Sequence, residues 1–282
     1  MPVPSSVVGL QTDPISHTID NRWVMSYAAG LGDESPVQLD PTRPGGLLAH
    51  PLFPVCFEWP TVLAVRHLGP LHDAVSAAEA RRAIHATHDL TITRLVVPGD
   101  VLRTVATVIG VQRRSPGAFL TMDMITTDAA GAEVCRTRQG SLYLGTDVQG
   151  PDRPAPPEAA MPELNAEPAH NETVAVGATA AHVYTECARI WNPIHTDLAV
   201  ALDAGLPGLI LHGTATLAHA VSVGVRQLGG GDPRTIRRIR GRFGAMVPMP
   251  GALTVRLDGN GRFDVCNAEG GLAVKAGFLD LA

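Results

Sequence analysis

The stretch Tyr184–Gly213 reads YTECARIWNPIHTDLAVALDAGLPGLILHG, and it decides how the rest of the chain is interpreted. It combines a histidine, an asparagine and acidic side chains with two turns that contain proline. It ends in His212-Gly213, just before an apolar run of small residues. Polar side chains this dense beside apolar helix are typical of the mouth of a ligand pocket rather than of plain hydrophobic core.

A weaker copy of this stretch lies near the N-terminus. Residues 32–40 (GDESPVQLD) align with residues 189–197 (RIWNPIHTD) and share a proline and the final aspartate at the same spacing. Three more matches follow in the same order: LAH (48–50) with LH (211–212), VPGDVL (97–102) with MPGAL (249–253), and DAAGAEV (128–134) with NAEGGLAV (267–274). Four matches in one order indicate an internal duplication.

Both copies predict the same series of elements. A helical pattern begins at Asn21 and ends at Gly30, and the apolar run after Pro54 predicts a buried helix. Residues 83–144 hold four β-branched runs separated by turns, which predict an antiparallel sheet, whereas the first twenty residues are irregular. The second copy begins with a short strand at 173–176. Between the copies, six prolines (151, 154, 156, 157, 162 and 168) predict a linker that cannot fold alone.

The composition limits the classes of protein to consider. The 282 residues are 45% hydrophobic, enough to bury a sizeable core, and the net charge of −5 gives no reason to expect a nucleic-acid partner. No apolar run reaches the roughly eighteen residues of a membrane span, and the N-terminus lacks the pattern of a secretory signal. Four widely spaced cysteines are expected to be free thiols (56, 135, 187 and 266). We therefore expect a cytoplasmic protein with no membrane partner.

The two copies together resemble the double hot-dog form of the MaoC-like dehydratase / (R)-specific enoyl-CoA hydratase family. The C-terminal copy carries the family motif as Tyr184, Asn192-Pro193-Ile194-His195-Thr196-Asp197, Gly205 and His212-Gly213. The resemblance implies an α+β fold in which two antiparallel sheets each wrap a central helix and join edge to edge as a pseudo-dimer. It implies an N-terminal hot-dog half with a degenerate motif (1–146), a Pro-rich linker (147–170) and a C-terminal half with a hydratase-like motif (171–282).

The resemblance also implies a reaction. It predicts a lyase that adds or removes water at the 2,3-position of an acyl thioester, either 2-enoyl-CoA and 3-hydroxyacyl-CoA or a carrier-protein equivalent, in fatty acid or polyketide metabolism. No cofactor and no metal is expected, and a homodimer stays one alternative for its assembly. Hydration needs a base for water, an acid for Cα and donors for the enolate oxygen. In the family an Asp and a His five residues later serve the first two needs, and backbone N–H groups opening the central helix serve the third.

Individual residues receive roles from this match. His195 is the predicted acid/base, because an imidazole can do either near neutral pH. Asn192 is predicted to hold the loop or the substrate, and the Gly213 N–H to stabilise the enolate; close helix–sheet packing is the alternative reason for that glycine. Asp197 is interpreted as the N-cap of a helix at 198–204. The predicted substrate-binding residues are Tyr184, Trp191, His212, Arg240 and Arg242, where the two arginines would contact phosphates or else form a solvated strand face.

The chain departs from the family at the acid. Ile190 stands at the Asp position, and an isoleucine can neither orient water nor carry a proton. The N-terminal copy has the opposite defect, because it keeps Asp33 but has Gln38 at the His position. The two sites of a hot-dog dimer are separate, so we do not expect Asp33 to complement His195.

Two side chains near Ile190 are candidate replacements for the acid. Glu186 is the predicted one and His182 an alternative, both weighed against a solvated helix face. The altered motif keeps other functions open. One is another hot-dog reaction, namely isomerisation, cyclisation or thioester hydrolysis of a biosynthetic intermediate. The other is a non-catalytic subunit that binds acyl thioesters.

One histidine pair invites a metal interpretation that we do not adopt. His85 and His88 are three residues apart in a predicted strand. Alternation along a strand then predicts side chains on opposite faces.

Overall fold

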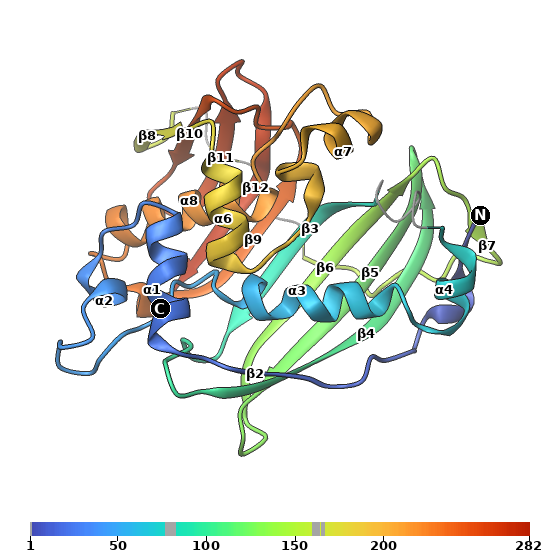
Figure 1. Ribbon diagram of the computed structural model, residues 1–282, viewed down its shortest axis with the longest axis horizontal. Helices are drawn as coiled ribbons and strands as arrows, with labels where there is room; N and C mark the ends of the chain where they lie inside the picture. The colour runs from blue at the N-terminus through green and yellow to red at the C-terminus, as the bar shows by residue number, and fades with distance from the viewer. Residues whose placement is uncertain (1, 77–82, 160–163, 165–166) are drawn as a thin grey trace.

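The computed structural model describes residues 2–76, 83–159, 164 and 167–282. Its main feature is a ten-stranded antiparallel sheet that wraps around helices (Figure 1). One half of the sheet comes from the N-terminal copy, in the order β2 (Ile15–Thr18), β4 (Val101–Arg114), β5 (Gly117–Thr127), β6 (Glu133–Leu144) and β3 (Ala83–Ile92). The other half follows in the order β9 (Ile236–Phe243), β12 (Leu272–Leu281), β11 (Arg262–Asn267), β10 (Gly251–Leu257) and β8 (His170–Val176).

The strand order of one half is the mirror image of the other. The halves meet where β3 pairs with β9, with Leu90 opposite Ile239 in the register. Counted from this seam outward, each half runs through its second, fifth, fourth, third and first strand. A pseudo-two-fold relation therefore passes through the β3–β9 pair, as the internal duplication predicts. The predicted edge-to-edge joining of two sheets is confirmed.

Helices cover the inner face of the sheet. In the N-terminal copy these are α1 (Asn21–Gly30), α2 (Pro36–Leu39), α3 (Pro54–Val65) and α4 (Gly69–Ala74). In the C-terminal copy they are α6 (Ala180–Ala188), the 3-10 turn η2 (Pro193–His195), α7 (Leu198–Asp203) and α8 (Gly213–Gln227). Short peripheral elements complete the chain: β1 (Val3–Pro4), η1 (Ser5–Val7), β7 (Val148–Gln149) and η3 (Pro233–Thr235). The predicted helices at 21–30 and after Pro54 are confirmed.

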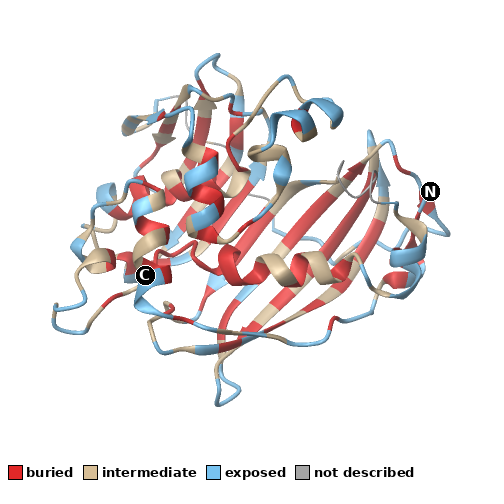
Figure 2. Ribbon diagram, in the orientation of Figure 1, coloured by how far each residue is buried: buried red, intermediate tan, exposed pale blue. Residues whose placement is uncertain are grey.

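A hydrophobic core runs between the sheet and the helices (Figure 2). In α8 the buried side chains are almost all small, and Ala215, Ala218 and Val221 are at most 1% exposed. Small side chains let the helix approach the sheet closely. At Gly224 the side chain of Leu279 in β12 occupies the space that a Cβ would need. Within the described residues, no helix is long and apolar enough to cross a membrane.

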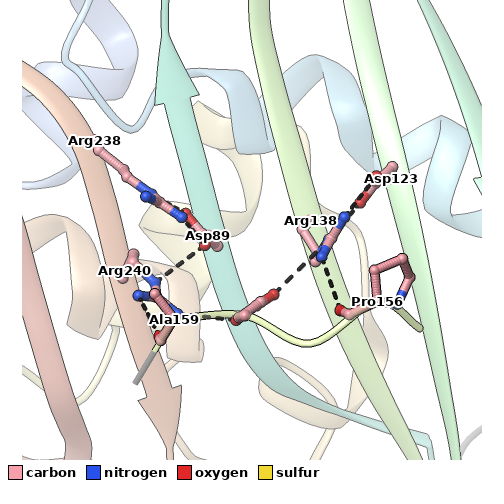
Figure 3. A network of polar contacts seen from close by, with 8 residues as sticks. Asp89, Asp123, Arg138, Pro156, Ala159, Arg238 and Arg240 are labelled. Atoms are coloured by element: carbon pink, nitrogen blue, oxygen red, sulfur yellow. Dashed lines mark hydrogen bonds and ion pairs between the residues drawn. The ribbon is translucent and has the colours of Figure 1, made fainter. Parts of the chain in front are cut away.

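The segment between the two copies lies on the outer face of the sheet. Thr137 of β6 donates a hydrogen bond to Glu58 of α3 (2.6 Å), so its neighbour Arg138 points to the face away from the helices. There Arg138 donates to the Pro156 carbonyl oxygen (3.3 Å) and pairs with Asp123 (2.7 Å; Figure 3). Arginines of the sheet thus anchor the described part of this Pro-rich segment, and Pro162 lies outside the described residues.

Candidate active site

The loop that carries His195 is a 3-10 turn built by backbone hydrogen bonds. The His195 N–H donates to the Asn192 carbonyl oxygen (3.2 Å), and the Asp197 N–H donates to that of Pro193 (2.8 Å). The Asp197 carboxylate then accepts from the N–H groups of Ala199 (2.9 Å) and Val200 (3.3 Å). Asp197 is therefore the N-cap of α7, as predicted, and it fixes the exit of the loop.

One nitrogen of the His195 ring is hydrogen-bonded to the backbone, and the other makes no hydrogen bond to the described residues. Nδ1 lies 2.9 Å from the Ile210 carbonyl oxygen, and because a carbonyl can only accept, Nδ1 carries the proton of the neutral ring. Nε2 keeps its lone pair and makes no hydrogen bond to the described residues. Burial lowers the pKa of His195 to about 4, so the ring is neutral at neutral pH. The geometry thus presents Nε2 as a proton acceptor.

A second histidine braces the first. The rings of His195 and His212 are stacked, with centroids 3.7 Å apart and planes 26° apart. His212 is 2% exposed, and its Nε2 lies 3.1 Å from the Thr185 hydroxyl of α6. Burial, and then the neighbouring His195, lower the pKa of His212 well below its ordinary value. Two stacked neutral imidazoles therefore link α6, the 3-10 turn and the start of α8.

The start of α8 has free backbone donors. His212 precedes the helix and makes no side-chain capping hydrogen bond, and the first backbone bond of the helix runs from the Thr216 N–H to the His212 carbonyl oxygen (3.0 Å). The N–H groups of Gly213, Thr214 and Ala215 consequently have no partner one turn earlier. Such a helix start favours negative charge. It is the element that the predicted oxyanion role requires.

Gly213 also packs tightly against the sheet. A Cβ at this position would lie 3.0 Å from the ring of Phe243 in β9, closer than side chains normally approach. Beside it, the Tyr184 hydroxyl donates to the Thr214 hydroxyl oxygen (3.1 Å). The close-packing alternative for the glycine and its exposed N–H are therefore compatible.

No described carboxylate contacts His195. Ile190 is 5% exposed and belongs to the hydrophobic core, and its N–H donates to the Thr185 carbonyl oxygen (3.1 Å). Glu186 lies on the exposed side of α6 and makes no hydrogen bond or ion pair to the described residues. His182 lies 3.0 Å from the Thr196 carbonyl oxygen through its Nε2 and so braces the loop. None of these three residues places a carboxylate beside His195.

Asp33 lies in a different place. Its Oδ2 accepts from the Ser222 hydroxyl (3.2 Å), nine residues beyond Gly213 in α8. At the α-helical rise this separation is about 14 Å along the axis. Asp33 therefore does not meet His195, in agreement with the expectation from the sequence.

The other predicted binding residues are dispersed. Trp191 is 58% exposed next to the loop, and the side-chain amide of Asn192 makes no hydrogen bond to the described residues. Arg240 is 7% exposed and bonds to Asp89 (3.0 Å) and Glu158 (2.9 Å), so its charge is already neutralised on the outer face (Figure 3). Arg242 is exposed on the same strand.

The sequence reasoning missed the threonines and misplaced one histidine pair. Thr185 and Thr214 join α6 to α8, and no sequence pattern marks them. The rings of His85 and His88 lie 5.3 Å apart, which corrects the expectation of opposite faces, because an irregularity in β3 between His85 and Thr87 interrupts the alternation. Within the described part of the chain, no group of three or more His, Cys, Asp or Glu side chains is placed to hold a metal ion.

Two family models match the chain. Residues 6–137 match the FAS1-like dehydratase domain region, and residues 161–275 match the MaoC like domain. Together with the mirrored sheet, they support a double hot-dog fold. The first half of the chain is similar to the FAS1-like dehydratase region and the second half to the MaoC like domain.

Known proteins share the fold and a short part of the sequence. The peroxisomal enoyl-CoA hydratase 2 of Arabidopsis thaliana is 42% identical over 53 residues, which are 19% of this chain and 17% of that enzyme. The solved MaoC-like dehydratase of Phytophthora capsici has a TM-score of 0.86 at 21% identity, covering 98% of this chain and 96% of that one. A Mycobacterium tuberculosis protein described as having a double hot-dog fold has a TM-score of 0.62 at 17% identity, covering 97% and 96%.

Proposed function

We propose that the chain adds or removes water at the 2,3-position of an acyl thioester, with His195 as its single acid/base. The observation that carries this proposal is the free Nε2 of a neutral His195. The ring of His195 stacks on His212, which directly precedes the uncapped start of α8. Hydration needs these two features close together, a proton acceptor for water and donors for an enolate oxygen. The MaoC-like domain match and the hydratase relative support the same chemistry.

The reaction proceeds in two steps at the proposed site. Nε2 of His195 takes a proton from water while the water oxygen bonds to C3 of the enoyl thioester. The π electrons of the C2–C3 bond move to the thioester oxygen, whose negative charge is stabilised by the backbone N–H of Gly213. The imidazolium then returns the same proton to C2 as the enolate collapses. Dehydration is the reverse sequence, and no second acid is consumed.

Other side chains serve as supports in this proposal. The Ile210 carbonyl keeps the proton of His195 on Nδ1, and His212 holds the plane of the ring through its bond to Thr185. The exposed Arg242 is the predicted arginine that remains available for the phosphates of CoA or a carrier arm. Asn192 and Trp191 remain predicted contacts of the acyl or pantetheine portion.

Labelled water separates this reaction from its alternatives. Incubation of a short 2-enoyl-CoA with the protein in ¹⁸O-water is expected to give 3-hydroxyacyl-CoA with one label at C3 by mass spectrometry. An isomerase or cyclase would leave the product unlabelled. A thioesterase would place the label in a free carboxylate and release the thiol. A binding subunit would return the substrate unchanged, and each of these three results would contradict the proposal.

A further inference from the structure

The N-terminal copy of the motif borders a cleft of about 590 Å³ that the proposed reaction does not use. Its walls come from both halves of the molecule: the loop around Asp33 and Gln38, the strand β8, and the second half of α8 with His219, Ser222 and Arg226. This volume is in the range of small-molecule pockets. The degenerate motif therefore lines a cleft.

A directed chain of hydrogen bonds orients the Asp33 carboxylate. The Leu52 N–H donates to Nδ1 of His50 (3.0 Å), so the proton of that neutral ring is on Nε2. Nε2 therefore donates to the Ser222 hydroxyl oxygen (3.1 Å), and the hydroxyl donates to Oδ2 of Asp33 (3.2 Å). The Ser35 N–H donates to Oδ1 (3.0 Å). Both carboxylate oxygens keep a lone pair for a further donor.

The cleft offers unused acceptors. Gln38 is 2% exposed, and its Oε1 has no hydrogen-bond partner among the described residues. That oxygen lies beneath the surface of the cleft, so the acceptors that a ligand can reach are the two oxygens of Asp33. The Nε2–H of His50 is committed to Ser222, and the Ser222 hydroxyl is committed to Asp33. A ligand that contacts the free lone pairs of Asp33 must therefore bring its own N–H or O–H groups.

The charge of the lining selects among such ligands. Asp33 and Glu34 have no cationic partner among the described residues, whereas Arg226 is paired with Glu172. Burial lowers the pKa of His219 to about 4, so it adds no positive charge at neutral pH. The net field of the cleft is negative, and it disfavours the phosphates of CoA.

The cleft lacks the donors of a hydratase site. His50 aligns with His212, and the residue after it is Pro51 where the other copy has Gly213. Proline has no N–H, and the next N–H, that of Leu52, is bonded to His50. The start of α3 thus offers no N–H at the place where α8 offers Gly213. This favours binding over a second hydration centre.

We propose that the cleft binds a small aliphatic amine in its protonated form. The ammonium group donates to the Asp33 carboxylate, and the alkyl chain lies against Leu31, Val174 and Val225, which line the same cleft. An ammonium group satisfies the free acceptors and the negative charge together, while a neutral alcohol satisfies only the acceptors.

Titration calorimetry at pH 7 with the full chain tests this proposal. The probes are n-pentylamine, n-pentanol and n-pentanoate, which share an alkyl chain and differ in charge. We expect pentylamine to bind, pentanol to bind at least about tenfold more weakly because it lacks the charge-assisted bond, and pentanoate to give no heat. Equal binding of pentylamine and pentanoate, or no heat from pentylamine, would overturn the proposal. This comparison uses only wild-type protein.

Two substitutions locate the amine. Asp33→Asn keeps the size of the side chain and removes its charge, so pentylamine affinity should fall about tenfold or more. The matched control Asp13→Asn removes an exposed carboxylate outside the cleft and should leave affinity unchanged. Equal affinities in the two folded variants, checked by thermal melting, would remove Asp33 from the site. Because binding rather than turnover is measured, the result is independent of the hydration assay.

Discussion

The buried rings of Tyr27 and Tyr184 pack against each other, with centroids 5.9 Å apart and planes 56° apart. Each packs beside the histidine of its own copy: Tyr27 lies 5.7 Å from His50, and Tyr184 lies 5.0 Å from His212. Each tyrosine also stands six residues before the acid position of its motif. The two copies therefore keep the same aromatic scaffold.

The copies differ in the polar groups placed on that scaffold. One has Asp33 and Gln38, and the other has Ile190 and His195 at the matching positions. The first pair adjoins a negatively charged cleft, and the second adjoins the free donors of α8. We infer that duplication allowed the two halves to specialise, one for hydration by a single base and the other for binding.

Returning a carboxylate to the hydration site should accelerate it. Ile190→Asp places an acid five residues before His195, and positioned acid/base groups contribute roughly 10²–10⁴-fold, so we expect a gain of at least about tenfold in kcat. A buried charge is costly, and the variant should lose about 2–4 kcal/mol of unfolding free energy. Ile190→Asn is the control of equal size. A similar gain with Asn, or none in folded Ile190→Asp, would contradict the single-base account.

The pH dependence of hydration should reflect the burial of His195. A solvated histidine would lose activity below about pH 6.5. Because burial lowers the pKa of His195 to about 4, kcat/KM should stay level from pH 8 to about 5 and fall only near pH 4. The profile is measured with circular dichroism at each pH to confirm folding. An acidic limb near pH 6.5 would mean that another group is the base.

Glu58 should make the folded protein less stable as the pH rises. Burial raises its pKa from 4.5 to about 7, and the Thr137 hydroxyl donates to its Oε1 (2.6 Å). A raised carboxyl pKa stabilises the folded protein fully below pH 4.5, and this contribution is lost as pH rises through 7. Glu58→Gln should therefore gain about 1–3 kcal/mol relative to wild type between pH 5 and pH 8. Urea unfolding at both values measures this, and the exposed Glu269→Gln should show no such change.

The sequence predicts long elements well and short ones poorly. The helix at 21–30, the helix after Pro54 and the four strands at 83–144 have patterns long enough to show a period. The strand β2 has four residues and adds the edge of the sheet by pairing with β4, so the irregular first twenty residues did not reveal it. The local irregularity in β3 likewise has no clear signal in the sequence. It brings the side chains of His85 and His88 together, where regular alternation would separate them.

The site residues that lie within a sequence motif could be predicted. The NPIHTD sequence predicts the loop that carries His195, and the HG sequence predicts that Gly213 opens the following helix. Contacts between distant segments were not predictable, because they depend on how the elements pack. Thr185 reaches His212 from α6, and Glu158 of the linker neutralises Arg240. These pairs appear only in the folded chain.

Hydration by the His195 variant tests the central claim most directly. The absorbance of the conjugated thioester is followed as a short 2-enoyl-CoA is hydrated by wild type, His195→Ala and the half-buried control His170→Ala. His170→Ala changes a histidine in β8, outside the proposed site. Loss of the proposed acid/base should lower kcat about 10²-fold or more in His195→Ala, with little change in the control. Equal hydration rates for wild type and a folded His195→Ala protein would contradict the account.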